Sequence, residues 1–279
     1  MKNFLAVFDG YKISESTLAY AQQLASVANA RLVGVFLDDL FYHSYNLAKT
    51  LSTSENAEAR ITELNEKDRV KRDEAVGLFK SSCEAARVFY SIHRDGSIAL
   101  QELKLESMFA DLIIINESEN FSQVREQTPS RFIKELLADV QCPVMVVPPT
   151  YSSIHKIVLL YNGDPSSVYA VKMFTYLLDH FNGLPVEVLT VKPSKTDLNL
   201  PNPKLMEEFI RSHFPEAGIT VKQGDAEEEI LSYLRTGKEN ELVVLGAYRR
   251  SEISRWFKTS MADILMRELD TPLFIAHSS

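Results

Sequence analysis

The residues best suited to chemistry lie near the end of the chain, where cationic and hydroxyl side chains follow a glycine. Between Gly246 and Ser260 the net charge is +3, because four cationic residues outnumber the single acid Glu252: Arg249, Arg250, Arg255 and Lys258. Glycine lets main-chain N–H groups approach a polyphosphate, and arginine and hydroxyl groups bind phosphate oxygens. The pattern indicates an anion or nucleotide site. A solvated basic loop, or a set of ion pairs between domains, is the alternative explanation.

The chain carries one pattern twice, which indicates two copies of a single domain. Residues 2–10 (KNFLAVFDG) have a counterpart in residues 155–163 (HKIVLLYNG), and residues 110–116 (ADLIIIN) in residues 240–246 (NELVVLG). A repeat this long predicts two domains, not a solenoid of short units. We place the boundary at the prolines near 148–153, which gives an N-terminal domain of residues 1–150 and a C-terminal domain of residues 151–279.

Each copy alternates short apolar runs with amphipathic segments, the pattern of an α/β domain with a mostly parallel sheet. The strands expected in the first copy are residues 4–8, 31–37, 86–93, 110–116 and 144–147. Those expected in the second are residues 157–161, 185–192, 219–223, 240–246 and 273–276. We expect two Rossmann-like domains, each with five strands in the order 3-2-1-4-5 and helices on both faces.

The two copies differ most after their second strand. The first carries a helical insertion at about residues 40–86, in which Ser52 and Glu55 form a capping-box pattern ahead of a long charged helix from Ser54 to Ala86. That helix is expected to be a solvated cover for the sheet or a docking arm. In the second copy, Asp164 and Pro165 predict the start of a helix that runs to about His180.

A ligand of such a sheet binds at the carboxyl ends of its first and fourth strands, where the strand order reverses. Asp9 and Asn116 lie there in the first copy, and Asn162 and Gly246 in the second. Asp9 and Asn162 can accept a hydrogen bond from a ligand, or they are simply turn residues that end a strand.

The two-copy layout and the register from Gly246 to Ser260 resemble the universal stress protein family in its tandem form, whose fold is that of the adenine nucleotide alpha hydrolases. ATP-binding members carry a glycine, two residues, a second glycine, nine residues, a third glycine and then serine or threonine. Here Arg249 and Thr259 stand at the second and third glycine positions. The resemblance implies a set of cofactor-binding residues in the C-terminal domain: Asn162, Gly163, Val191, Gly246, Ala247, Arg249, Thr259 and Ser260.

In the first copy the same register has no glycine. It reads Asn116, Glu119, Pro129 and Ser130, and the net charge from 116 to 130 is −2, because Glu117, Glu119 and Glu126 outnumber Arg125. Side chains at the glycine positions crowd the approach of a phosphate, and Pro129 has no N–H to donate. We expect no nucleotide in the N-terminal domain.

These observations favour a non-enzymatic, stress-response regulatory protein with degenerate nucleotide-binding motifs. The alternative is a sensor that binds ATP or another adenine nucleotide through its C-terminal domain only. A hydrolase or transferase finds no support, because the chain lacks a nucleophile elbow, a P-loop and a His-x-Gly-His element. We therefore assign no catalytic residue. The six histidines and two cysteines lack metal-ligand spacing, so we expect no metal.

Bulk properties and the closing strands suggest what the protein contacts. The net charge of −8 argues against nucleic acid and anionic membranes as partners, and no apolar run is long enough to span a bilayer, so we expect a cytoplasmic protein.

The closing strands, 144–147 and 273–276, are apolar sheet edges that we expect to pair within the chain as a pseudo-dimer. Trp256 and Phe257 are expected to pack against the other copy or to anchor a partner. Further pairing into a homodimer, and the identity of any protein partner, stay open.

Overall fold

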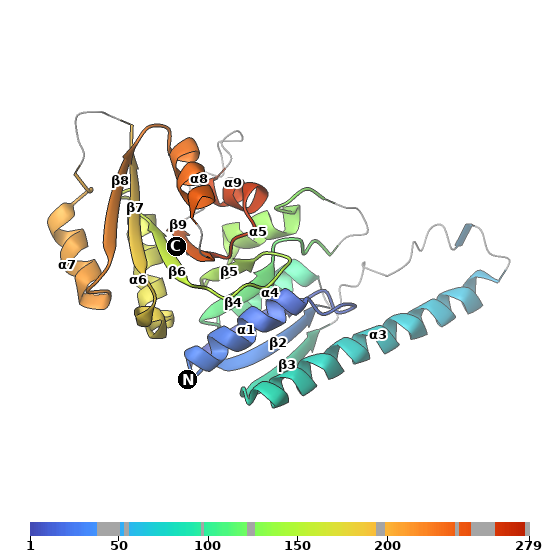
Figure 1. Ribbon diagram of the computed structural model, residues 1–279. Helices are drawn as coiled ribbons and strands as arrows, with labels where there is room; N and C mark the ends of the chain where they lie inside the picture. The colour runs from blue at the N-terminus through green and yellow to red at the C-terminus, as the bar shows by residue number, and fades with distance from the viewer. Residues whose placement is uncertain are drawn as a thin grey trace.

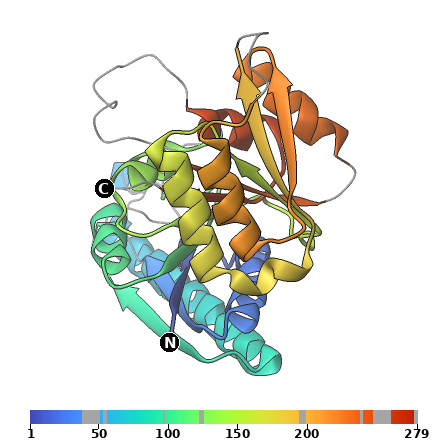
Figure 2. The same cartoon turned by 90° about the vertical axis from the view of Figure 1, so that its left-hand side faces the viewer.

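The strands of both halves form one sheet in the computed structural model, which describes residues 1–37, 51–52, 56–95, 98–121, 126–193, 199–237, 240–246 and 260–276. The N-terminal half supplies β1 (Asn3–Phe8), β2 (Arg31–Leu37), β3 (Tyr90–Asp95), β4 (Leu112–Asn116) and β5 (Val144–Val147). The C-terminal half supplies β6 (Lys156–Leu160), β7 (Val186–Lys192), β8 (Gly218–Gln223), β9 (Glu241–Gly246) and β10 (Leu273–Ala276). The two halves lie side by side, blue to green and yellow to red (Figures 1 and 2).

The strand order confirms the topology predicted for each copy. The sheet has ten strands in the order β3-β2-β1-β4-β5-β10-β9-β6-β7-β8, which is 3-2-1-4-5 in each half. Within each half all neighbouring strands are parallel. The inner parallel strands are buried on both faces, which explains their continuous apolar sequences, whereas the outer strands β3 and β8 are partly exposed.

The two halves join where β5 pairs antiparallel with β10, as the apolar closing strands predicted. Leu273 lies opposite Val146, Phe274 opposite Met145 and Ile275 opposite Val144. All residues of both strands are buried. Each closing strand therefore covers the edge that the other would otherwise expose.

The helices cover both faces of the sheet and bury a separate apolar cluster on each. The cluster on one face includes residues of α1 (Glu15–Val27), α3 (Ala57–Ala86), α6 (Pro165–Leu177) and α7 (Pro203–His213). The cluster on the other includes residues of α4 (Ala99–Ser107), α5 (Arg131–Asp139), α8 (Ala226–Thr236) and α9 (Met261–Glu268). A short 3-10 helix spans Asp179–Gly183. Among the described residues, no helix combines the length and apolar character that crossing a bilayer requires.

The long helix α3 combines a packed half and a solvated half. Ala75, Phe79 and Cys83 are buried against the sheet, whereas the first turns project beyond it (Figure 1). Ion pairs one turn apart, such as Lys67–Glu63 and Arg69–Asp73, support the projecting part. The helix thus serves as a cover over only part of its length.

Several predicted boundaries were wrong, each for a local reason. Helix α3 begins after Asn56, not at Ser54, and Asn56 makes no side-chain capping bond; residues 53–55 of the predicted capping box lie outside the described residues. The helix ends at Ala86, and the left-handed φ of 55° at its C-cap residue Arg87 turns the chain, so β3 starts at Tyr90 and not at residue 86. In the C-terminal half, α6 ends at Leu177, before the predicted His180.

Phe79 fixes the position of α3 because it fills the space above a glycine in β2. The Phe79 ring is fully buried and contacts the rings of Phe8 and Phe36 at centroid distances of 5.9 and 5.8 Å. A β-carbon at Gly34 would lie 2.8 Å from that ring. Gly34 therefore provides the room for Phe79, and the two residues should be energetically coupled.

We predict that Gly34→Ala lowers the free energy of unfolding by about 1–3 kcal/mol, because the added methyl group overpacks the Phe79 ring. Phe79→Leu should partly restore stability in the double variant, since the smaller side chain makes room. Urea unfolding of the four proteins in this double-mutant cycle measures the coupling. Strictly additive effects would show that the two residues do not share this space.

Candidate functional site

The structure brings the predicted ligand-binding positions together at two places, one in each half. Strands β1 and β4 are paired neighbours, which puts Asp9 and Asn116 at one edge of the sheet. Strands β6 and β9 are likewise paired, with β7 on the other side of β6, so Asn162, Gly246 and Val191 share an edge. Because β5 and β10 run antiparallel, the strands of the two halves point in opposite directions. The carboxyl ends of the strands, and with them the two sites, therefore lie at opposite ends of the sheet.

In the N-terminal site, Asp9 closes the turn that follows β1. Its Oδ1 atom accepts hydrogen bonds from the backbone N–H groups of Tyr11 at 2.9 Å and Lys12 at 2.8 Å. Burial raises the pKa of the Asp9 carboxyl above its ordinary value, although these two bonds oppose the shift. Asp9 therefore acts as a turn residue that ends the strand, which is one of the two roles predicted for it.

Glu119 places a second acidic group beside Asp9. It occupies the register of the second glycine in the ATP-binding motif, and burial raises the pKa of its carboxyl to about 8, with the negative charge of Asp9 adding to the shift. A phosphate at this position would meet two acidic groups and a side chain where the motif has bare main chain. The bulk of this side chain opposes the close approach of a phosphate to the backbone.

Two further polar side chains of the motif register, those of Ser130 and Asn116, are hydrogen-bonded within the protein. The Ser130 hydroxyl caps α5 by accepting from the backbone N–H of Ile133 at 3.2 Å, and it donates to the Glu119 carbonyl at 2.5 Å. The Asn116 amide donates to the Pro148 carbonyl at 3.2 Å, while its oxygen accepts from Ser118. The serine and asparagine of the motif register thus hold the loop together.

A residue that sequence reasoning missed, Arg72 of α3, also reaches this site. Its guanidinium lies 4.3 Å from the centre of the Tyr11 ring and donates a hydrogen bond to the Tyr11 hydroxyl. Tyr11 follows Asp9 by two residues, so the insertion helix lies over the turn at the end of β1. One arginine within a long charged helix gave no signal of this contact.

In the C-terminal site, Asn162 makes a turn of the same kind. Its side-chain oxygen accepts from the backbone N–H of Asp164, and its amide donates to the Asp164 carboxylate, both at 3.0 Å. Asp164 is the N-cap residue of α6 but makes no side-chain capping bond, contrary to prediction, because its carboxylate binds Asn162 instead. The Asn162 amide is therefore already engaged by its own turn.

Gly246 is required by helix packing. A β-carbon at this position would lie 2.5 Å from the backbone carbon and oxygen of Ser166, in the first turn of α6. The close approach of α6 to the end of β9 thus explains the glycine without a ligand.

Ser260 is the N-cap residue of α9, and its hydroxyl accepts from the backbone N–H of Asp263 at 3.2 Å. It repeats the role of Ser130 in the other half, so the two positions correspond in structure as they do in sequence. Val191 is partly buried and packs on the apolar cluster beneath the site. Three other predicted site residues lie outside the described residues, as do the neighbouring basic and aromatic side chains: Ala247, Arg249, Thr259, Arg250, Arg255, Trp256, Phe257 and Lys258.

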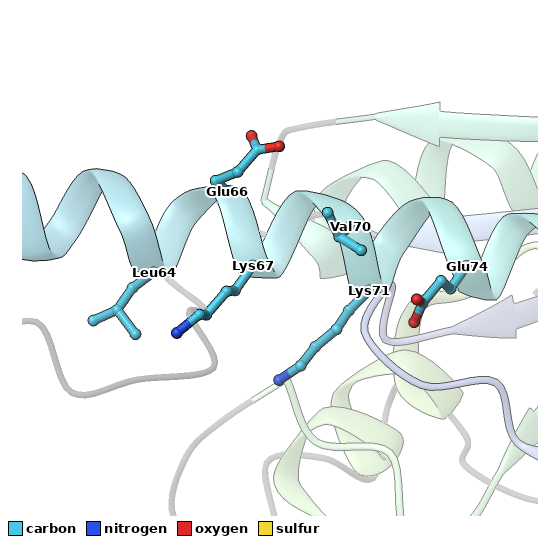
Figure 3. Close-up of a pocket in the computed structure, with 6 residues that line it drawn as sticks. All are labelled: Leu64, Glu66, Lys67, Val70, Lys71 and Glu74. Atoms are coloured by element: carbon cyan, nitrogen blue, oxygen red, sulfur yellow. The ribbon is translucent and has the colours of Figure 1, made fainter.

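A hollow beside α3 is unrelated to either strand-end site. Its lining residues all belong to that one helix and mix apolar with charged side chains (Figure 3): Leu64, Glu66, Lys67, Val70, Lys71 and Glu74. The described residues also contain no group of three histidine, cysteine or acidic side chains placed to hold a metal ion.

We predict that Gly246→Ala lowers the free energy of unfolding by about 1–3 kcal/mol, since its methyl group meets backbone atoms that cannot rotate away. Gly77→Ala is the matched control, because Gly77 lies within α3 and a β-carbon there has nothing within 4 Å. That control should gain about 0.5–1 kcal/mol from helix propensity. Chemical denaturation measures both; equal stabilities for Gly246→Ala and wild type would refute the packing explanation.

Two carboxyl groups in the loop after β4, those of Glu117 and Glu119, should make the free energy of unfolding depend on pH. Burial raises the pKa of Glu117 to about 8, assisted by the negative charge of Asp270 from the other half, and the pKa of Glu119 is also raised to about 8. Between the unfolded value of 4.5 and these folded values, the folded state holds protons that the unfolded state has released. Stability therefore falls as pH rises, by up to about 1.4 kcal/mol per pH unit for each group.

Denaturant unfolding at several pH values between about 5 and 8 tests this directly. Glu119→Gln and Glu117→Gln should each give a shallower decline than wild type, and the double variant the shallowest. Curves parallel to that of wild type would contradict the assignment.

Comparison with known proteins extends the similarity over the whole chain. No family model matches the sequence. A universal stress protein of Synechocystis is 22% identical over 288 aligned positions, which cover 98% of this chain and 99% of that protein.

Solved structures show the same fold along both halves. A universal stress protein from Archaeoglobus fulgidus superposes with a TM-score of 0.72 at 14% identity, covering 99% of this chain and 98% of that one. A functionally unknown protein from Pseudomonas aeruginosa follows with a TM-score of 0.57 at 14% identity, covering 98% and 92%. The resemblance inferred from the sequence is thereby confirmed: along both halves the chain is similar to universal stress proteins of tandem length.

Proposed function

We propose that this chain is a tandem universal stress protein that acts as a non-enzymatic regulator of the stress response in the cytoplasm. The proposal rests chiefly on Glu119. Its side chain stands at the position where the ATP-binding motif needs a glycine, so the N-terminal half presents bulk to a phosphate in place of bare main chain. With one half unsuited to nucleotide, the protein works through its surfaces and the partners that they bind.

The C-terminal half supports the same conclusion by a different route. The Asn162 amide is bound to Asp164, and Gly246 is packed against α6, so neither residue depends on a ligand for its place. The sequence also lacks a motif that pairs a nucleophile with a base, which favours binding over catalysis. The nucleotide-binding motifs are in this view remnants with structural roles.

A second candidate function is an adenine-nucleotide sensor that uses the C-terminal half only. It is favoured by the shared edge of Asn162, Val191 and Gly246 and by the net charge of +3 between Gly246 and Ser260. In this account the arginine side chains replace the close main-chain cradle that glycines would provide.

Calorimetric titration with ATP, ADP and AMP separates the two candidates. We predict no heat of binding at millimolar nucleotide for the wild type. Micromolar binding that is lost in Ser260→Ala would instead support the sensor, and Ser130→Ala is the matched control because it removes the equivalent helix cap from the other half, at a similar cost of about 1 kcal/mol. Sustained release of phosphate from ATP would contradict the non-enzymatic proposal.

A further inference from the structure

The segment at residues 199–202 lies directly on the turn that follows β6. A β-carbon at Gly163 would lie 2.6 Å from Cβ of Pro201, and Gly163 has a left-handed φ of +86°. Only a glycine fits such a turn without strain, and here it also lets the proline approach. The backbone of the turn and the ring of Pro201 are therefore in direct contact.

A hydrogen bond and an apolar anchor hold this segment in place. The hydroxyl of Tyr161, a buried residue just before the turn, donates to the Pro201 carbonyl at 2.9 Å. Leu200 is 5% exposed and belongs to the apolar cluster that α6 and α7 share. Thr190 of β7 bonds in turn to the Tyr161 carbonyl at 2.7 Å, which fixes the strand from which the hydroxyl projects.

This contact covers the position where a ligand of the C-terminal half would enter. Asn162 and Gly163 follow the central strand β6, between β7 and β9, which is the switch point of that half. The segment comes from the crossover between β7 and α7. It therefore contacts Gly163, one of the residues that the resemblance assigns to nucleotide binding.

The N-terminal half has an equivalent contact, made by the corresponding crossover, which differs in sequence and structure. There the crossover between β2 and β3 includes α3, whose Arg72 lies on Tyr11 beside the turn at Asp9. That cover belongs to a 30-residue helix with Phe79 fully buried, whereas the C-terminal contact is made by a short segment through the Tyr161 hydroxyl, Pro201 and Leu200. The two halves thus cover the same place with different elements.

We propose that residues 199–202 form a releasable clasp that closes the C-terminal strand-end site, and that an adenine nucleotide enters only when the clasp leaves Tyr161 and Gly163. The inference rests on the second candidate function, in which the C-terminal half is the nucleotide site. The clasp keeps the affinity of the resting protein low, because only the open fraction is competent to bind.

Tyr161→Phe tests the clasp, because it removes the hydroxyl while keeping the buried ring. Hydrogen exchange should become faster in peptides that contain residues 199–202, and the calorimetric Kd for ATP should fall by about three- to tenfold, the effect of one lost hydrogen bond on a mostly closed equilibrium. Tyr169→Phe, on a half-buried tyrosine of α6, is the matched control and should change neither quantity. Pro201→Gly, which removes the ring from the turn, should act in the same direction as Tyr161→Phe.

Each outcome separates the clasp from the proposed regulatory function. If Tyr161→Phe binds ATP and wild type does not, the clasp and the regulatory function are both supported. If wild type binds ATP at micromolar concentration and Tyr161→Phe binds it more tightly, only the clasp is supported. If neither protein binds, the clasp is overturned and the regulatory function stands. If both bind equally well, or if exchange is unchanged in both Tyr161→Phe and Pro201→Gly, the clasp is overturned as well.

Discussion

The antiparallel pairing of β5 with β10 is the interaction on which the rest of the architecture depends. Each is a fully buried apolar strand at the edge of its half, and an exposed edge of this kind invites association with other chains. Joining the two edges gives one sheet in which all other neighbours are parallel. The same pairing reverses the direction of the second half, so the two strand-end sites lie on opposite edges. A single ligand cannot bridge them, and each site can change independently of the other.

The two copies have changed these sites in different ways. In the N-terminal half, the Glu119 side chain occupies the space that a phosphate would need, and Ser130 joins the loop to α5 through its hydrogen bond to the Glu119 carbonyl. In the C-terminal half the Asp164 carboxylate binds the Asn162 amide, and Pro201 lies against the turn at Gly163. The proposed clasp would make the second closure reversible, whereas the bulk of Glu119 in the first half is built into the loop.

Sequence patterns predicted the elements well because buried parallel strands and amphipathic helices leave a local signal. Strands β2, β5 and β10 begin and end where the apolar runs do, and the apolar closing strands predicted the pairing of the two halves. The site was harder to predict. Gly246 looked like a phosphate-loop glycine, yet α6 requires it for packing; Arg72 meets Tyr11 across 61 residues, and Tyr161 meets Pro201 across 40. Contacts this distant leave no periodic pattern, so they appear only once the chain is folded.

A crystal structure of the protein grown with millimolar MgATP tests the central claim most directly, because the two sites are far apart and can be assessed separately. The account predicts no nucleotide at the end of β1 and β4, with Ser130 still bound to the Glu119 carbonyl. Any nucleotide would lie at the end of β6 and β9, with residues 199–202 displaced from Gly163. An intact adenine nucleotide at the N-terminal site, with its phosphates against the loop that carries Glu119, would contradict the account.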